Sequence, residues 1–175
     1  MKLLSVNTAS SSRKQSKPRQ RGGKRRTPVQ PRGIGRAMLL ILLIAYSSAL
    51  VYWMFIGFGR SVHTEGPFRY NLEPLRTIKL YFDLDNGVSF LGRLINLLGN
   101  VIVFVPFGFL LPLLRRSLRS VLLLLFVSAL GILFLETVQM LLRVGSFDID
   151  DVLLNLAGVL TGYIVLWIVF LMGKR

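Results

Sequence analysis

The chain has 175 residues, of which 53% are hydrophobic and 17% are charged. Soluble domains carry about 25% charged residues, so this composition is typical of a membrane protein and excludes a largely disordered chain. Basic residues outnumber acidic residues by 22 to 8, which gives a formal net charge of +14. The sequence has no cysteine, and this excludes disulfides, thiolate metal sites and cysteine nucleophiles.

The first 36 residues differ in composition from the rest of the chain. They hold 11 of the 22 basic residues and no acidic residue, among many Ser, Gln, Pro and Gly. They show no helical or strand period, so residues 1–36 are predicted to form a disordered basic tail. Because a membrane span follows immediately, we expect this tail to lie against anionic lipid in the cytoplasm. A nucleic-acid partner, which the charge alone would allow, is not expected.

Four apolar segments are long enough to cross a bilayer, which takes about 20 residues in a helix. They are residues 37–58, 94–114, 121–142 and 152–172, and each is almost free of charge. Backbone polar groups find no water in lipid, so the spans must be helices. Residues 37–175 are therefore predicted to form an all-α domain, a four-transmembrane-helix bundle. A kink or local opening is expected at Pro106 and Pro112.

The distribution of Lys and Arg predicts the orientation of the bundle in the membrane. With four spans, the tail, the loop 115–120 and the C-terminal end share one side, which holds 16 basic residues. The loops 59–93 and 143–151 share the other side and hold 6. Both termini are therefore expected in the cytoplasm. Seven of the eight acidic residues lie in the two outer loops, and the eighth, Glu136, lies within a span.

Glu136 is the most informative single residue, since an ionisable group inside a span costs about 2.5–3.5 kcal/mol on insertion scales. It lies six residues before the end of the third span, roughly 9 Å below the outer surface. Gln139 and Arg143 follow at spacings i+3 and i+7, which would place all three side chains on one helical face. Intramembrane carboxylates are by default candidates for a functional site.

Neighbouring spans carry polar residues at a similar depth. The second span has Asn96 and Asn100 four residues apart, and Asn155 in the fourth span follows Asp151 at the same spacing. Buried polar groups need partners, so the sequence predicts one shared polar pocket in the outer half of the bundle. Its residues would be Asn96, Asn100, Glu136, Gln139, Arg143, Asp148, Asp151 and Asn155. The alternative is a polar network that locks the helices together.

Two weaker patterns lie in and before the last span. Gly158 and Gly162 match the spacing of small residues in close helix packing, either inside the monomer or across a dimer. Asp148, Asp150 and Asp151 offer oxygen ligands for a divalent cation. A solvated turn with a helix N-cap at Asp151 is the more common role of such a group, so no metal and no cofactor are expected.

Residues 96–114 and 136–163 resemble the VanZ-like family of bacterial membrane proteins. The resemblance rests on Asn96, Asn100, Pro106, Phe107, Gly108, Leu111, Pro112, Glu136, Gln139, Phe147, Asp148, Asp150, Asp151, Asn155, Gly158, Gly162 and Tyr163. Residues 71–78 resemble a further segment of the family, with Leu75 where Phe is usual. The resemblance implies a multi-pass protein of the bacterial plasma membrane. The named member of that family is associated with low-level resistance to the glycopeptide antibiotic teicoplanin.

The leading hypothesis is a non-catalytic protein of the cell envelope. Its outward-facing polar pocket would bind a lipid-linked envelope component or an amphiphilic antibiotic. A second hypothesis is an intramembrane enzyme for lipid-linked substrates with Glu136 as general base, although no strong nucleophile or histidine accompanies this carboxylate. A third is a proton or ion carrier through Glu136, although a relay generally uses more than one intramembrane acid.

Overall fold

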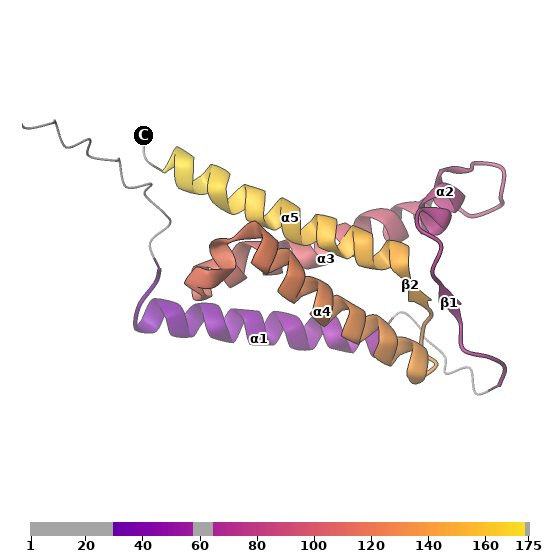
Figure 1. The fold of residues 1–175 in the computed structure, drawn as a ribbon, viewed down its shortest axis with the longest axis horizontal. Helices are drawn as coiled ribbons and strands as arrows, with labels where there is room; N and C mark the ends of the chain where they lie inside the picture. The colour runs from indigo at the N-terminus through magenta and orange to yellow at the C-terminus, as the bar shows by residue number, and fades with distance from the viewer. Residues whose placement is uncertain (1–29, 58–64, 174–175) are drawn as a thin grey trace, which may run out of the picture.

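The computed structural model describes residues 30–57 and 65–173 of the chain. Most of the predicted basic tail, residues 1–29, lies outside the described residues, so its disorder stays a prediction. The described chain consists mainly of helices that run side by side along the long axis of the molecule (Figure 1). This agrees with the predicted all-α bundle.

Four long helices correspond to the four predicted spans. They are α1 (Ile34–Phe55), α3 (Phe90–Leu114), α4 (Val121–Leu141) and α5 (Ile149–Met172). Each of them is long and apolar enough to cross a membrane. The start of α3 is set by Ser89, whose hydroxyl accepts a hydrogen bond from the Gly92 N–H at 3.1 Å. This helix continues unbroken past Pro106 and Pro112, so of the two expected effects, a kink or a local opening, the opening is not seen and the kink stays a prediction.

The first turn of α3 contains Arg93, a charged residue that the predicted span excluded. Its side chain is buried. The guanidinium donates to the carbonyls of Val88 and Tyr81, each at 2.9 Å, and to the Asn86 side-chain oxygen at 2.7 Å. It also donates to the Asp83 carbonyl. Arg93 therefore holds the loop before α3 by hydrogen bonds to the carbonyl groups of that loop. These bonds satisfy the guanidinium, so a buried cation is tolerated at this end of the helix.

Short elements connect the long helices. β1 (Tyr70–Asn71) and α2 (Arg76–Phe82) precede α3, the 3₁₀ helix η1 (Arg116–Arg119) joins α3 to α4, and β2 (Phe147–Asp148) precedes α5. β1 and β2 pair in parallel, and the Phe147 N–H donates to the Arg69 carbonyl at 3.0 Å. Neither strand was predicted. Figure 1 shows β1, β2 and α2 together at one end of the bundle, which we call the loop end.

The closest helix pair is α3 with α5. A Cβ added to Gly158 would lie 2.0 Å from the Val101 carbonyl oxygen, and one added to Gly162 would lie 1.9 Å from the Val105 carbonyl oxygen. Real side chains never come that close to backbone, so both positions require glycine. The two glycines therefore serve close packing of α5 against α3 within one chain, which is the first of the two roles that their spacing predicted.

α1 lies at the periphery of the bundle. Its buried residue is Leu50, whereas α3, α4 and α5 each bury several. The most completely buried hydrophobic residues of the described chain are Leu124 and Ile132 on α4 and Val159 on α5. The core thus lies among α3, α4 and α5, and α1 adds to it from one side.

The glycine packing generates a first prediction. Gly158→Ala should lower the stability of the detergent-solubilised protein by about 1–3 kcal/mol, because α3 and α5 must separate to admit the methyl group. Gly131→Ala on α4 is the matched control, since a Cβ there meets nothing within 4 Å. It should be neutral or stabilising by up to about 1 kcal/mol. Equal thermal unfolding temperatures for the two variants would contradict this account of the α3–α5 interface.

Candidate functional site

The acidic loop before α5 is buried rather than solvated. Asp148 is the N-cap of α5, and its carboxylate accepts a hydrogen bond from the Asp150 N–H at 2.9 Å. The same carboxylate accepts from the Asn71 amide at 3.1 Å and from the Thr77 hydroxyl at 2.6 Å. The predicted cap at Asp151 is wrong, because the helix begins before that residue.

Asp150 is fully buried, and its carboxylate binds the start of α2. One oxygen accepts from the Leu75 N–H at 2.5 Å, and the other accepts from the N–H groups of Thr77 and Ile78 at 2.7 and 3.2 Å. The first turn of a helix leaves such N–H groups without intrahelical partners, and a negative charge is favoured there. Leu75 holds a left-handed φ of 66°, which a non-glycine residue keeps only where its surroundings require it.

Asn71, Thr77, Asp148 and Asp150 form one cluster, which we call the loop clamp. It ties β1 and α2 to the first turn of α5 through hydrogen bonds between residues more than 70 positions apart. All four carboxylate oxygens of its two aspartates accept hydrogen bonds from protein groups. Among the described residues no group of three or more His, Cys, Asp or Glu is arranged to hold a metal ion. The acidic loop therefore acts as a structural clamp.

A cavity of about 260 Å³ lies at the loop end, and we call it the polar cavity. Its lining residues are Arg69, Asn96, Gln139, Val144, Gly145, Ser146 and Asp151. They come from the segment before β1, from the loop before β2 and from α3, α4 and α5. The structure thus brings together three of the residues predicted for the pocket, from three different helices.

Hydrogen bonds orient the predicted amides around this cavity. Asn100 donates to the Asp151 carboxylate at 2.5 Å, which links α3 to α5. Gln139 donates to the Met54 carbonyl at 2.8 Å, which links α4 to the last turn of α1. Asn96 donates back to its own helix, to the carbonyl one turn earlier. Asn100 therefore acts on the cavity through Asp151, whereas Asn96 and Gln139 line it directly.

Glu136 and Asn155 are buried beside the cavity without lining it. Glu136 precedes Gln139 by three residues, which places it about 4.5 Å deeper along α4. Asn155 follows Asp151 by four residues, which places it about 6 Å deeper along α5. The acid that the sequence singled out thus lies nearer the middle of the bundle than the cavity wall.

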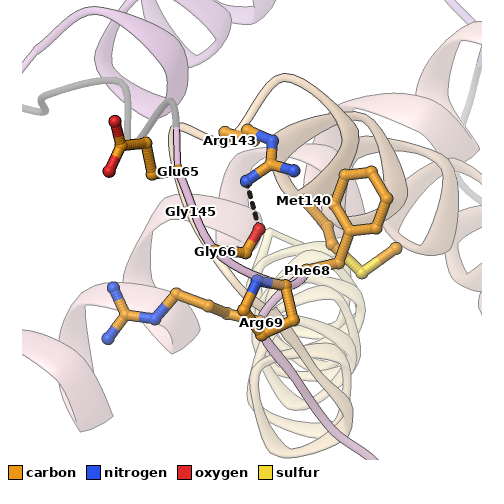
Figure 2. A pocket seen from close by; sticks show the side chains of 8 residues that line it. Glu65, Gly66, Phe68, Arg69, Met140, Arg143 and Gly145 are labelled. Carbon is orange, nitrogen blue, oxygen red and sulfur yellow. Dashed lines mark hydrogen bonds between the residues drawn. The ribbon is translucent and has the colours of Figure 1, made fainter.

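Arg143 lies outside α4, which ends at Leu141, and has a left-handed φ of 58°. The predicted continuation of the Glu136 face to Arg143 is therefore wrong. Its guanidinium donates to the Gly66 carbonyl at 2.7 Å and lies 4.9 Å from the centre of the Phe68 ring. Figure 2 shows this side chain directed toward the segment before β1.

Arg143 belongs to a second cavity, of about 360 Å³, which we call the arginine cavity. Figure 2 shows the residues around it, which are Glu65, Gly66, Pro67, Phe68, Arg69, Met140, Arg143 and Gly145. Arg69 and Gly145 line both cavities, so the two are neighbours. Sequence reasoning missed Arg69, although a cation in a loop predicted to be outside departs from the usual distribution of charge and was a usable signal.

Tyr81 on α2 also lies near the acidic residues. Burial raises the pKa of its phenol above the ordinary value, and the negative charges of Asp151 and Asp148 raise it further. Tyr81 is therefore a neutral hydrogen-bond donor at physiological pH. Asp148 in β2 and Asp151 in α5 act on Tyr81 because the hydrogen bonds of the loop clamp hold α2 close to the start of α5.

The loop clamp generates a second prediction. Asp150→Asn removes the negative charge and one acceptor oxygen, so part of the α2 first turn loses its partner at a cost of about 1–3 kcal/mol. Amide hydrogen exchange of residues 75, 77 and 78 should accelerate at least about fivefold. Exchange in the middle of α3 and α5 should stay at the wild-type rate.

Glu73→Gln is the matched control in the same segment. Glu73 is exposed and pairs at 3.5 Å with Arg76, which is also exposed. Such surface pairs contribute about 0–1 kcal/mol, so the variant should keep the wild-type exchange pattern. If both variants leave exchange at residues 75–78 unchanged, Asp150 is not what holds α2.

Comparison with models of known protein families matches residues 37–171, which include most of all four long helices, to the family described as VanZ/LLP1. No curated protein matches the chain, and no solved structure matches it. The family match covers most of the chain and agrees with the four apolar helices. The protein is a multi-pass membrane protein that belongs to the VanZ/LLP1 family.

Proposed function

We propose that the protein is a non-catalytic receptor in the bacterial plasma membrane, and that its polar cavity binds the polar part of an amphiphilic molecule from outside. The orientation is supported by the charge count, since 16 of the 22 basic residues fall on the side of the two termini. The loop end then faces the exterior. Its ligand comes from the outer leaflet or from the space beyond it.

The observation that carries this proposal is the composition of the polar cavity wall. It offers the Arg69 guanidinium, the Asp151 carboxylate, the amides of Asn96 and Gln139 and the Ser146 hydroxyl around about 260 Å³. Donors and acceptors are both present, which suits a group rich in hydroxyls and amides, such as a sugar or a short peptide. A lipid-linked envelope component and a glycopeptide antibiotic both carry groups of this kind.

The competing interpretation is a polar network that only locks the helices together. The hydrogen bonds of Asn100 to Asp151 and of Gln139 to Met54 do link helices. A network whose only role is to join helices does not need a cavity of this size lined by further donors and acceptors. Here about 260 Å³ stays open beside these bonds. The open volume favours a site for a ligand over a lock alone.

Catalysis through Glu136 has less support. A general base must come within about 2.6–3.2 Å of the proton that it takes, directly or through one water. Glu136 is buried and does not line the polar cavity. A buried carboxylate inside a span is also what a proton or ion carrier would use, so this function stays an alternative. Against it, Glu136 is the single acidic residue predicted inside a span, and a relay generally uses more than one. Binding without chemistry is therefore the function we propose.

Arg69→Gln tests the proposed function. The side chain lies in an exposed segment, so its loss should leave the bundle folded. Two probes, fluorescent teicoplanin and a prenyl-phosphate-linked disaccharide, are titrated separately into nanodiscs that contain the protein. At least one should bind the wild type, and Arg69→Gln should weaken that binding about tenfold or more, which corresponds to ~1.4 kcal/mol.

Arg76→Gln is the control for lost charge. Arg76 is exposed on α2, pairs with Glu73 and lines neither cavity. This variant should bind like the wild type. If neither probe binds the wild type, or if both arginine variants bind equally well, the proposed site is refuted.

A further inference from the structure

α1 is joined to the bundle by two polar contacts with a hollow between them. The Tyr46 hydroxyl donates to the Val103 carbonyl of α3 at 2.9 Å. Eight residues further along α1, the Met54 carbonyl accepts from Gln139 of α4 at 2.8 Å. Eight residues of helix span about 12 Å. Between these two contacts a cavity separates part of α1 from α4.

The hollow is an apolar groove of about 340 Å³, which we call the α1–α4 groove. Its walls come from three helices and include Leu50 of α1, Phe104 and Phe107 of α3 and Gly131 and Leu135 of α4. All of these residues lie inside the apolar spans. The groove is distinct from the two cavities at the loop end, with which it shares no lining residue.

Small residues account for the groove. Ser47 on α1 and Ser128 and Gly131 on α4 line it, and none of them fills the space between the helices. In membranes such residues usually allow helix backbones to touch, as Gly158 does here against α3. A Cβ on Gly131 would instead meet nothing within 4 Å. The small residues of this seam therefore leave a space between the helices that is large enough to admit part of another molecule.

The occupant of the groove must be hydrocarbon. The walls are almost entirely apolar, and the groove lies within membrane-spanning helices, where the surrounding solvent is lipid chain rather than water. The groove and the polar cavity also lie one helical turn apart along α4. Leu135 lines the groove, and Gln139, one turn later, lines the polar cavity.

We propose that the α1–α4 groove holds the acyl or prenyl chain of the same lipid whose polar group occupies the polar cavity. This inference rests on the proposed function and narrows the ligand to an amphiphile with a slender hydrocarbon chain. Gln139 lies on α4 between the chain site and the head-group site, where its hydrogen bond to Met54 holds α4 and α1 together beside the bound lipid. α1 buries a single residue against the bundle, so it is the helix that moves away from α4 when the chain enters.

The test uses a prenyl-phosphate-linked disaccharide that carries a photoreactive diazirine on its chain. After irradiation in nanodiscs, mass spectrometry locates the labelled peptides. In the wild type the label should fall on α1 and α4 around Leu50 and Leu135. Gly131→Leu, which fills the groove, should reduce this labelling at least fivefold. Ser47→Leu fills it from the α1 side and should give the same result.

Gly99→Leu is the matched control, because a Cβ on Gly99 also meets nothing within 4 Å and the residue does not line the groove. It should be labelled like the wild type. Binding of the water-soluble disaccharide phosphate, which lacks the chain, should be unchanged in Gly131→Leu if that variant is folded. This second readout separates the head-group site from the chain site.

The outcomes distinguish the two proposals. If binding depends on Arg69 but the chain labels other helices, or labels α1 and α4 equally in Gly131→Leu, the groove inference is overturned and the proposed function stands. If the wild type binds teicoplanin but neither the prenyl probe nor its soluble head group, the groove inference is overturned and the proposed function stands. If the wild type binds none of the three, the proposed function fails and the two-part ligand fails with it.

Discussion

The loop end depends on one buried carboxylate. Asp150, with no exposed surface, accepts three backbone N–H groups at the start of α2. Hydrogen bonds to a charged group contribute about 1.5–3 kcal/mol each, and a buried carboxylate without them would be very costly. Neighbouring Asp148 accepts hydrogen bonds from the side chains of Asn71 and Thr77. Together these bonds hold β1, and with it the preceding residue Arg69, against the start of α5. Because Arg69 lines both the polar cavity and the arginine cavity, the bonds fix one wall of each.

The rest of the bundle divides into a rigid pair and a loosely attached helix. α3 and α5 touch backbone to backbone at Gly158 and Gly162, a contact that leaves no room for adjustment. α1 is attached through Leu50 and two hydrogen bonds to backbone carbonyls. A receptor for lipids needs this combination, since the head-group site must be preorganised while the chain must enter sideways between helices. Arg93 extends the rigid part to the loop before α3.

Much of the fold could be predicted because its signals are local. The four spans follow from apolar length, and the stripe of Gly158 and Gly162 follows from helical spacing. The depth of Asn96, Gln139 and Asp151 follows from the rise per residue, and these three do line one cavity. Helix ends were predicted less well. Because Arg93 is charged, the second span was predicted to start after it. In the structure α3 starts earlier, at Phe90, because Ser89 caps the helix and the Arg93 guanidinium is buried.

The remaining features depend on contacts between distant residues, for which the sequence has no period. A strand pair of two residues has too little alternation to be recognised, and it joins positions 77 residues apart. The roles of Asp150 and Arg69 could not be predicted for the same reason, because their contacts are with residues far away in the sequence. Glu136 was expected to line the pocket, but depth along α4 alone did not show that Gln139 lines the cavity and Glu136 does not.

The absence of cysteine allows a direct test of the central claim, that an exterior polar cavity at the loop end binds a head group. Ser146→Cys places a single thiol in the cavity wall, and Ser117→Cys places one in η1 at the opposite end of the bundle. In intact cells a membrane-impermeant maleimide should label the first and spare the second. Added prenyl-phosphate-linked disaccharide or teicoplanin should slow the labelling. Labelling of Ser117→Cys instead, or labelling of Ser146→Cys that neither ligand slows, would contradict the account.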